Sequence, residues 1–179
     1  MLKTLGGHTQ MIIFKQQTCC FTGHRDLPKY EEQKVLTRVR YLLRPLIYRG
    51  VKYLAVGGAI GFDMVVAEYL LDHREKYQDK YKVISFLPYP DWRENWTEEQ
   101  IRRQDRIMER CDKVSYASPE YARDAFLLRD RLLVDASGYC ISYCHKRTGG
   151  TAYTVRYAMK NDVPVYNASS WDLRQLGRG

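Results

Sequence analysis

Three glycine-containing segments, each directly after a short apolar run, hold the residues of this chain that are best suited to chemistry. The first consists of Thr22, Gly23, His24 and Arg25. A glycine at the end of a strand permits a tight turn and a close approach of a ligand to the backbone. Arg25 adds a planar, permanently charged guanidinium that can clamp an anion. A plain turn with two solvated side chains is the alternative interpretation.

The second segment contains Gly57, Gly58, Gly61 and Asp63. Three glycines in five residues leave backbone amides exposed, which suits a phosphate group. The segment is not a Walker loop, because no Lys-Ser/Thr pair follows, and its spacing differs from the dinucleotide pattern G-x-G-x-x-G. Asp63 would lie in the first turn of a helix, where it would either cap the helix or accept a hydrogen bond from a ribose hydroxyl. Its charge would repel a phosphate.

The third segment is the strongest phosphate candidate and contains Gly149, Gly150, Thr151 and Thr154. Two glycines open a predicted helix whose first turn carries two threonine hydroxyls. Exposed amides, the positive end of the helix dipole and hydroxyl donors together favour an anion. The alternative is that Thr151 serves only as the helix N-cap.

Four further residues are candidates for ligand contacts. Tyr89 and Trp92 lie in a proline-stiffened loop after a predicted strand, and their rings would either stack on a base or cover the surface. Arg129 and Asp135 lie on one predicted helix but are six residues apart, so they do not share a face cleanly. A charged exterior stripe is the structural interpretation of that helix.

Short apolar runs alternate with longer helical patterns along the chain, which predicts an α/β fold with an open, mostly parallel sheet and helices on both faces. Because loops after parallel strands meet at one edge, we expect residues 57–61 and 149–151 to lie at the same edge. Residues 97–100 form a predicted capping box. Strands are predicted at residues 17–22, 51–56, 81–87, 112–116, 139–143 and 163–166, and helices at 30–48, 62–78, 97–110, 121–136 and 151–160. We expect one domain over residues 17–167, with an N-terminal extension at 1–16 and a tail at 168–179.

The composition is that of one globular domain: 179 residues, 45% apolar and 28% charged, which excludes a disordered, collagen-like or coiled-coil chain. The net charge of +8 favours anionic partners, namely nucleotides, nucleic acid or an acidic membrane. No apolar run is long enough to cross a bilayer, so no membrane partner is expected. Five cysteines without a secretory signal indicate a cytoplasmic protein. Cys140, Cys144 and His145 lack a second ligand pair at zinc spacing, so we expect no metal site.

The ordered set of motifs resembles the YpsA-type branch of the SLOG superfamily, which also includes the DprA/Smf and LOG proteins. The resemblance covers roughly residues 17–167 and implies a Rossmann-like sheet that binds a nucleotide or an ADP-ribose-like ligand. No further cofactor is implied. By this resemblance the ligand would be lined by Thr22, Gly23, Arg25, Gly57, Gly58, Gly61, Asp63, Arg129, Gly149, Gly150 and Thr151.

The chain also departs from its enzymatic relatives. LOG-type phosphoribohydrolases carry Pro-Gly-Gly-x-Gly-Thr-x-x-Glu, whereas Thr148 replaces the proline here and Ala152 the third glycine. Val155 and Arg156 stand where the acid would fall, and hydrolysis of an N-glycosidic bond needs such a carboxylate. The favoured function is therefore nucleotide binding or sensing, with catalysis left open. The alternatives are a LOG-like hydrolase and a DprA-like nucleic-acid-binding protein, and a homodimer is the default assembly.

Overall fold

The computed structural model of the protein describes residues 14–77 and 81–170, and within them six parallel strands form one open sheet. The strand order is β4-β3-β2-β1-β5-β6. The sheet confirms the predicted α/β, Rossmann-like class. The strands are β1 (Thr18–Gly23), β2 (Tyr53–Val56), β3 (Lys82–Leu87), β4 (Lys113–Tyr116), β5 (Tyr139–Tyr143) and β6 (Val165–Asn167).

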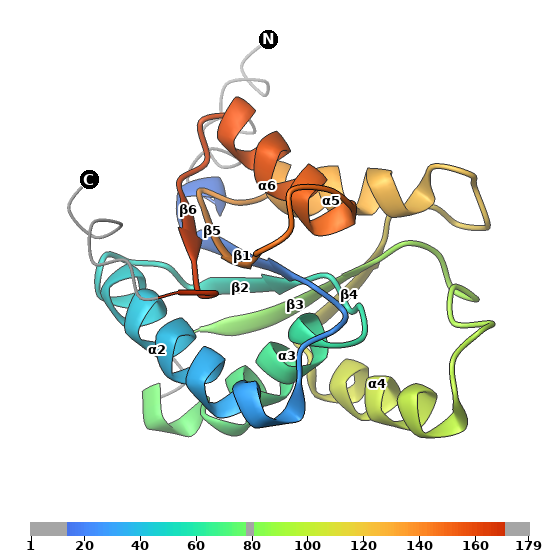
Figure 1. Cartoon of the computed structure of the whole chain (residues 1–179), viewed down its shortest axis with the longest axis horizontal. Coiled ribbons are helices and arrows are strands. Elements are labelled where there is room, and N and C mark those ends of the chain that lie inside the picture. Colours follow the sequence, from blue (N-terminus) through green and yellow to red (C-terminus); the bar gives the residue numbers. More distant parts are fainter. Residues whose placement is uncertain (1–13, 78–80, 171–179) are drawn as a thin grey trace, which may run out of the picture.

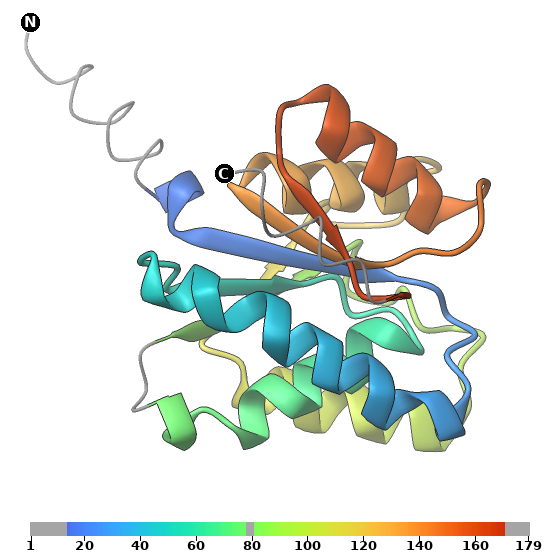
Figure 2. The same ribbon diagram turned by 60° about the vertical axis from the view of Figure 1, so that its left-hand side comes forward.

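Helices cover both faces of the sheet (Figure 1). One face carries α2 (Glu32–Tyr48), α3 (Phe62–Asp72) and α4 (Glu98–Arg110). The other face carries α5 (Ala125–Asp135) and α6 (Gly150–Lys160), and a second view separates the two layers clearly (Figure 2). Two short 3-10 helices, Lys29–Glu31 and Glu75–Tyr77, flank the first layer.

The burial pattern explains why these segments form strands and helices. All six residues of β1 are buried, as expected for a central strand covered on both faces. In α2 the buried residues Val35, Val39, Leu42 and Leu46 recur at helical spacing, which confirms the predicted apolar face. This face packs against the sheet in the largest of three hydrophobic clusters among the described residues, and a second, smaller cluster lies under α5 and α6.

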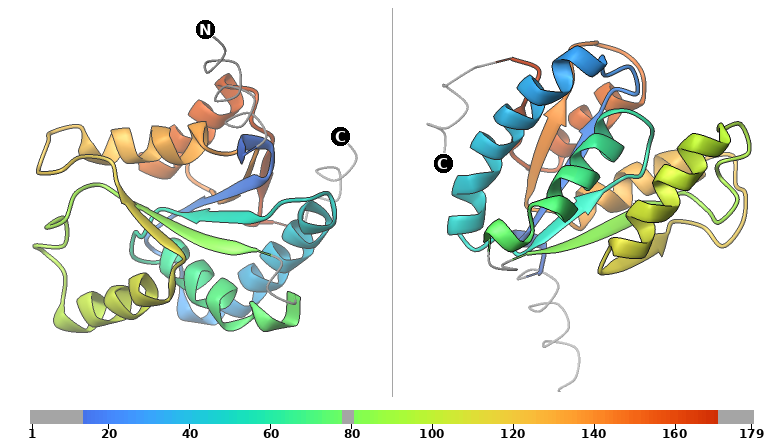
Figure 3. Two further views of the ribbon diagram at one scale, coloured as in Figure 1. Left: turned by 180° about the vertical axis from the view of Figure 1, so that it is seen from behind. Right: turned by 90° about the horizontal axis from the view of Figure 1, so that it is seen from below.

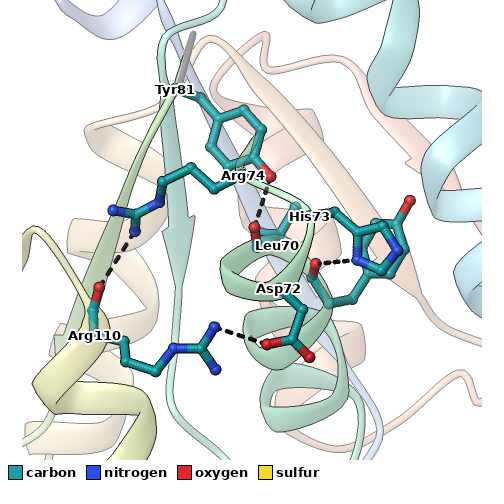
Figure 4. Close-up of polar contacts among 7 residues, drawn as sticks. Leu70, Asp72, His73, Arg74, Tyr81 and Arg110 are labelled. Atoms are coloured by element: carbon teal, nitrogen blue, oxygen red, sulfur yellow. Dashed lines mark hydrogen bonds and ion pairs between the residues drawn. The ribbon is translucent and has the colours of Figure 1, made fainter. Parts of the chain in front are cut away.

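The predicted helix at 62–78 is too long, because α3 ends at Asp72. The Tyr81 hydroxyl donates to the Leu70 carbonyl at 2.6 Å, so one of the last carbonyls of the helix is satisfied by the residue that precedes β3 rather than by a further turn (Figure 4). Arg110 of α4 donates to Asp72 at 2.7 Å and fixes the same end. The helix predicted at 121–136 starts later, at Ala125. The capping box is confirmed, since Thr97 and Gln100 bond reciprocally.

The order of the strands creates a switch point beside β1. The chain moves outward from β1 through β2, β3 and β4, and then returns to place β5 on the other side of β1 (Figure 3). Ligands of open α/β sheets bind at such a point, outside the carboxyl ends of the strands. The loops after β1, β2 and β5 all lie at this edge, so the prediction that residues 57–61 and 149–151 share it is confirmed.

The predicted extension and tail fall mostly outside the described residues, although the Arg38 guanidinium donates to the carbonyls of Ala168 and Ser169 at 3.1 and 2.9 Å. None of the helices in the described part of the chain combines the length and the apolar character that a bilayer span requires.

Candidate functional site

His24 joins the first glycine segment to the loop between β5 and α6. The ring is 6% exposed, and its Nε2 accepts the backbone N–H groups of His145 and Lys146 at 3.1 and 3.2 Å. This arrangement requires a neutral ring with its proton on Nδ1. Burial, and then the neighbouring His145 ring, lower the pKa of His24 and so favour that form. The structure therefore gives this predicted ligand residue a positioning role.

Glycines bring the first segment against the start of α3. A Cβ on Gly61 would overlap the Arg25 carbonyl oxygen and lie 2.7 Å from its Cα, and Gly61 has a φ of +86°. A Cβ on Gly23 would overlap the ring of Phe62, whose own amide donates to the His24 carbonyl at 3.2 Å. Close packing against the Phe62 ring at Gly23 and against the Arg25 backbone at Gly61, rather than an open cradle, explains these two glycines.

A buried polar cluster forms around Arg129, which is 7% exposed. Its Nη1 donates to the Gly57 carbonyl, and its Nε donates to Asp130 Oδ1 at 2.8 Å. Asp63 lies beside it and accepts the Ala59 amide on Oδ2 at 3.2 Å, while its buried Oδ1 has no partner in the described structure. A Cβ on Gly57 would lie 2.7 Å from Asp63 Oδ2 and 2.8 Å from Arg129 Nη1, so a side chain here would displace these two groups.

The cluster places two carboxyl groups around one guanidinium. Burial raises the pKa of Asp63 to about 7, against the opposing effect of Arg129. Burial also raises the pKa of Asp130, and Arg129 again opposes the shift. Arg25 from the first segment lowers the pKa of both carboxyl groups. The Thr154 hydroxyl lies between Asp130 and the Gly150 carbonyl, so it ties the cluster to the first turn of α6.

The start of α6 is open. Gly149 is the N-cap with a φ of +91°, and no side chain caps the helix, so the N-cap role considered for Thr151 is wrong. No atom lies within 4 Å of a Cβ placed on Gly149 or Gly150, apart from their immediate chain neighbours and the helix backbone. Gly149 and Gly150 are exposed, and the first amides of a helix have no partner within the helix, so this end of α6 is suited to an anion. Of the two cationic residues that precede it, Lys146 is ion-paired with Asp26 and Arg147 is exposed.

The aromatic candidates lie in a separate hydrophobic cluster. Tyr89 is 7% exposed and Trp92 is 6% exposed, and both pack with Leu87 and Ala125. The ring of Tyr89 meets the ring of Tyr121 edge-on at 5.6 Å between centroids. Stacking of either ring on a base stays a prediction.

The other predicted residues divide into two groups. Thr22 is buried near the end of β1. A Cβ on Gly58 would lie 3.1 Å from Gln104. Both residues therefore belong to the closely packed part of the carboxyl edge of the sheet. Asp135 is the last residue of α5, which runs back toward the amino ends of the strands, and there it accepts the Tyr157 hydroxyl at 3.1 Å. The structure does not bring Asp135 to the other site residues.

Sequence reasoning missed Asp130, which stands between two arginines in an apparently exterior stripe. For its neighbour Arg129 the sequence does hold a signal: Ala125, Arg129 and Leu133 recur every four residues, and the structure buries all three on the inner face of α5. Among the described residues, no three His, Cys, Asp or Glu side chains come together as metal ligands would.

Comparison with known proteins places the chain in a family. The YpsA family model, described as the YspA SLOG family, matches residues 20–173. The chain belongs to this YpsA family. Its relatives include UPF0398 proteins of Bacillus cereus (strain B4264), 25% identical over 118 residues, and of Bacillus anthracis (strain A0248), 24% identical over 129 residues. These alignments cover 62% and 68% of this chain, and 61% and 67% of the relatives. The chain thus spans about three fifths of the length of the first of them.

Two solved structures share the fold of this YpsA-family chain. DNA processing protein A (DprA) of Streptococcus pneumoniae has a TM-score of 0.61 at 16% identity, and the match covers 94% of this chain and 55% of that one. DprA of Helicobacter pylori, whose structure describes a single-stranded DNA binding mode, has a TM-score of 0.59 at 21% identity, covering 88% and 66%. At these identities the likeness concerns the fold alone.

Proposed function

We propose that this YpsA-family protein binds a nucleotide or nucleotide-derived ligand, of the ADP-ribose type, at the carboxyl edge of the sheet. The observation that carries the proposal is the open, glycine-led start of α6 beside the switch point between β1 and β5. A phosphate there would accept hydrogen bonds from the free amides of the first turn and would be favoured by the helix dipole. Arg25, exposed at this edge, adds positive charge, whereas Lys146 is ion-paired with Asp26.

A second observation favours a ligand with hydroxyl groups. Asp63 Oδ1 is buried without a donor, which is costly for a carboxyl oxygen. A ribose hydroxyl is a donor of the kind that this oxygen lacks, and Asp63 follows the glycine segment that faces the same edge. The proposed role is binding or sensing, because Val155 and Arg156 replace the acid that the related hydrolases carry. A homodimer remains a prediction.

Thermal-shift and calorimetric titrations of AMP, ADP, ADP-ribose and NAD against the parent and Gly150→Val test the proposal. Because a side chain at Gly150 enters empty space, the variant should fold while it blocks the amides. Loss of two hydrogen bonds of about 1.5–3 kcal/mol each should weaken binding at least tenfold. Ligand at about 100 times its dissociation constant should stabilise the parent by about 2.7 kcal/mol.

Met159→Val, at the exposed far end of α6, is the matched control and should bind as the parent does. Equal affinity of a folded Gly150→Val protein would contradict the phosphate position at the start of α6. Absence of any shift with the whole panel would contradict nucleotide binding itself.

Nucleic-acid binding is the second candidate function. The Helicobacter pylori DprA structure, which shares this fold, describes single-stranded DNA binding, and a net charge of +8 suits a polyanionic partner. Binding of an oligonucleotide with a steep dependence on salt would support this function.

A further inference from the structure

The outer face of α6 carries a hollow of about 420 Å³ that lies away from the carboxyl-edge site. Four of the lining residues recur along α6 at helical spacing, so they form one stripe on the helix. In Figure 2 this helix lies beside α5 in the layer that covers one face of the sheet. The hollow is lined by Arg131 from α5 and by Tyr153, Arg156, Tyr157, Lys160 and Asn161.

Two tyrosines of the stripe are held in a fixed, nearly parallel orientation. The rings of Tyr153 and Tyr157 are 6.2 Å apart with an angle of 19° between their planes. Arg131 donates to the Tyr153 hydroxyl at 2.7 Å, and its Cζ lies 5.9 and 6.0 Å from the two ring centroids. The Tyr157 hydroxyl donates to Asp135 at 3.1 Å. Rings anchored at their hydroxyl ends lose little freedom when a planar partner binds.

The charge of the hollow is entirely positive. Arg131, Arg156 and Lys160 line it, and no acidic side chain among the described residues does so. Arg156 also donates to the Arg147 carbonyl at 2.9 Å, which points the cationic stripe toward the open start of α6. Tyr153 and Tyr157 are half-buried, and cations beside accessible aromatic rings are the combination that tracks a phosphate backbone and stacks unpaired bases.

We infer that the outer face of α6 binds a single strand of nucleic acid, with phosphates beside Arg131, Arg156 and Lys160 and bases against the two tyrosines. The inference rests on the second candidate function above and names its surface. The helix has 11 residues and is therefore about 16 Å long, more than one nucleotide occupies, which favours a strand over a single nucleotide.

A rival basic surface exists between α2 and α3. There the Arg44 guanidinium lies 5.7 Å from the ring of Tyr48, and Arg40 is close by. That groove, however, is also lined by three carboxylates, Glu32, Glu68 and Asp72. Arg103 and Arg110 neutralise Glu68 and Asp72, so Glu32 is left to oppose a phosphate backbone, whereas the α6 hollow has no acidic lining residue. The α6 stripe is the surface with complementary charge along its length.

The test is fluorescence anisotropy of a labelled oligothymidine of about 15 nucleotides, near the upper end of single-strand site sizes, with the full chain over a salt series. Three phosphate contacts predict a slope of log K against log salt of about −2, at about 0.7 for each contact. The double variant Arg156→Ala/Lys160→Ala should reduce the slope by about 1.4. The matched double variant Arg40→Ala/Arg44→Ala removes the same charge from α2 and should leave the slope unchanged.

The aromatic part of the surface is tested separately. Tyr157→Leu should weaken binding at least about fivefold through lost stacking, whereas Tyr157→Phe retains the ring and should bind nearly as the parent does. Equal binding of a duplex of the same length would overturn the single-strand inference. Full binding by the α6 variants, with loss in the α2 variant, would overturn the surface and leave nucleic-acid binding standing.

If the parent protein does not bind the oligonucleotide at low salt, both the α6 surface and nucleic-acid binding itself are overturned. The small-ligand site is measured independently by the Gly150→Val thermal shift, so the failure of one function does not imply failure of the other.

Discussion

Three glycine-to-alanine substitutions separate two reasons for which this chain needs glycine. Gly61 has a φ of +86°, and a Cβ there would overlap the backbone of Arg25. Gly50 has a φ of +100°, but nothing lies within 4 Å of an added Cβ. Gly150 has neither a positive φ nor a close neighbour. Gly61→Ala therefore combines backbone strain with steric overlap. Gly50→Ala introduces backbone strain alone, and Gly150→Ala introduces neither.

The magnitudes follow from these differences. A side chain in the left-handed region costs roughly 1–2 kcal/mol, and overlap with atoms that cannot move away adds about 1–3 kcal/mol. Each substitution also restricts the unfolded chain, which gains about 0.4–1 kcal/mol of stability. Gly61→Ala should thus lower the free energy of unfolding by about 2–4 kcal/mol and Gly50→Ala by about 1 kcal/mol. Gly150→Ala should leave it unchanged or raise it slightly.

Urea unfolding followed by tryptophan fluorescence measures all three values, since Trp92 is buried in the fold. The difference between Gly61→Ala and Gly50→Ala reports the overlap with Arg25. Equal destabilisation by these two variants would refute the close approach of the first and second glycine segments. A loss above about 1 kcal/mol in Gly150→Ala would refute the open start of α6.

Three further predictions concern single side chains. Because burial raises the pKa of Asp63 from 3.8 to about 7, the folded protein holds a proton there that the unfolded chain has released. The free energy of unfolding should therefore fall by up to about 1.4 kcal/mol per pH unit as the pH rises between these two pKa values. Urea unfolding at a series of pH values measures this dependence, and Asp63→Asn should flatten it. His24→Phe should speed hydrogen exchange of the two loop amides that its Nε2 accepts, and unchanged exchange would contradict its positioning role. Tyr81→Phe should lower the free energy of unfolding by about 1 kcal/mol through loss of the bond to Leu70, as measured by chemical denaturation.

The features that could be predicted from the sequence depend on local spacing. The apolar face of α2 and the reciprocal bonds of Thr97 and Gln100 are both encoded within a few residues, and both predictions are confirmed. The shared edge of residues 57–61 and 149–151 follows from the rule that parallel strands are connected by right-handed crossovers. The same rule, applied to the direction of α5, would have placed Asp135 at the opposite edge.

The contacts inside the candidate site could not be predicted, because their partners are distant in sequence. His24 accepts amides about 120 residues away, and Arg129 bonds a carbonyl 72 residues before it. Nothing local to Asp130 distinguishes an inward carboxylate from a solvated one. The burial of Tyr89 depends on a cluster to which Leu87 and Ala125 contribute, and its loop alone does not encode it.

The central position of β1 has a consequence for how the chain acquires its fold. Thr18–Gly23 is the first strand in sequence, yet it pairs on one side with Tyr53–Val56 and on the other with Tyr139–Tyr143. During synthesis the half-sheet from β1 to β4 can assemble early, while the second edge of β1 waits for a strand made more than 100 residues later. Before β5 is made, this edge of β1 has unpaired backbone N–H and C=O groups, and the residues of β1 are ones that the fold buries. Such an edge is a template for pairing with another nascent chain. Pairing of β5 with β1 covers the exposed edge. Substitutions that delay this pairing should therefore lower the soluble yield more than they lower the equilibrium stability.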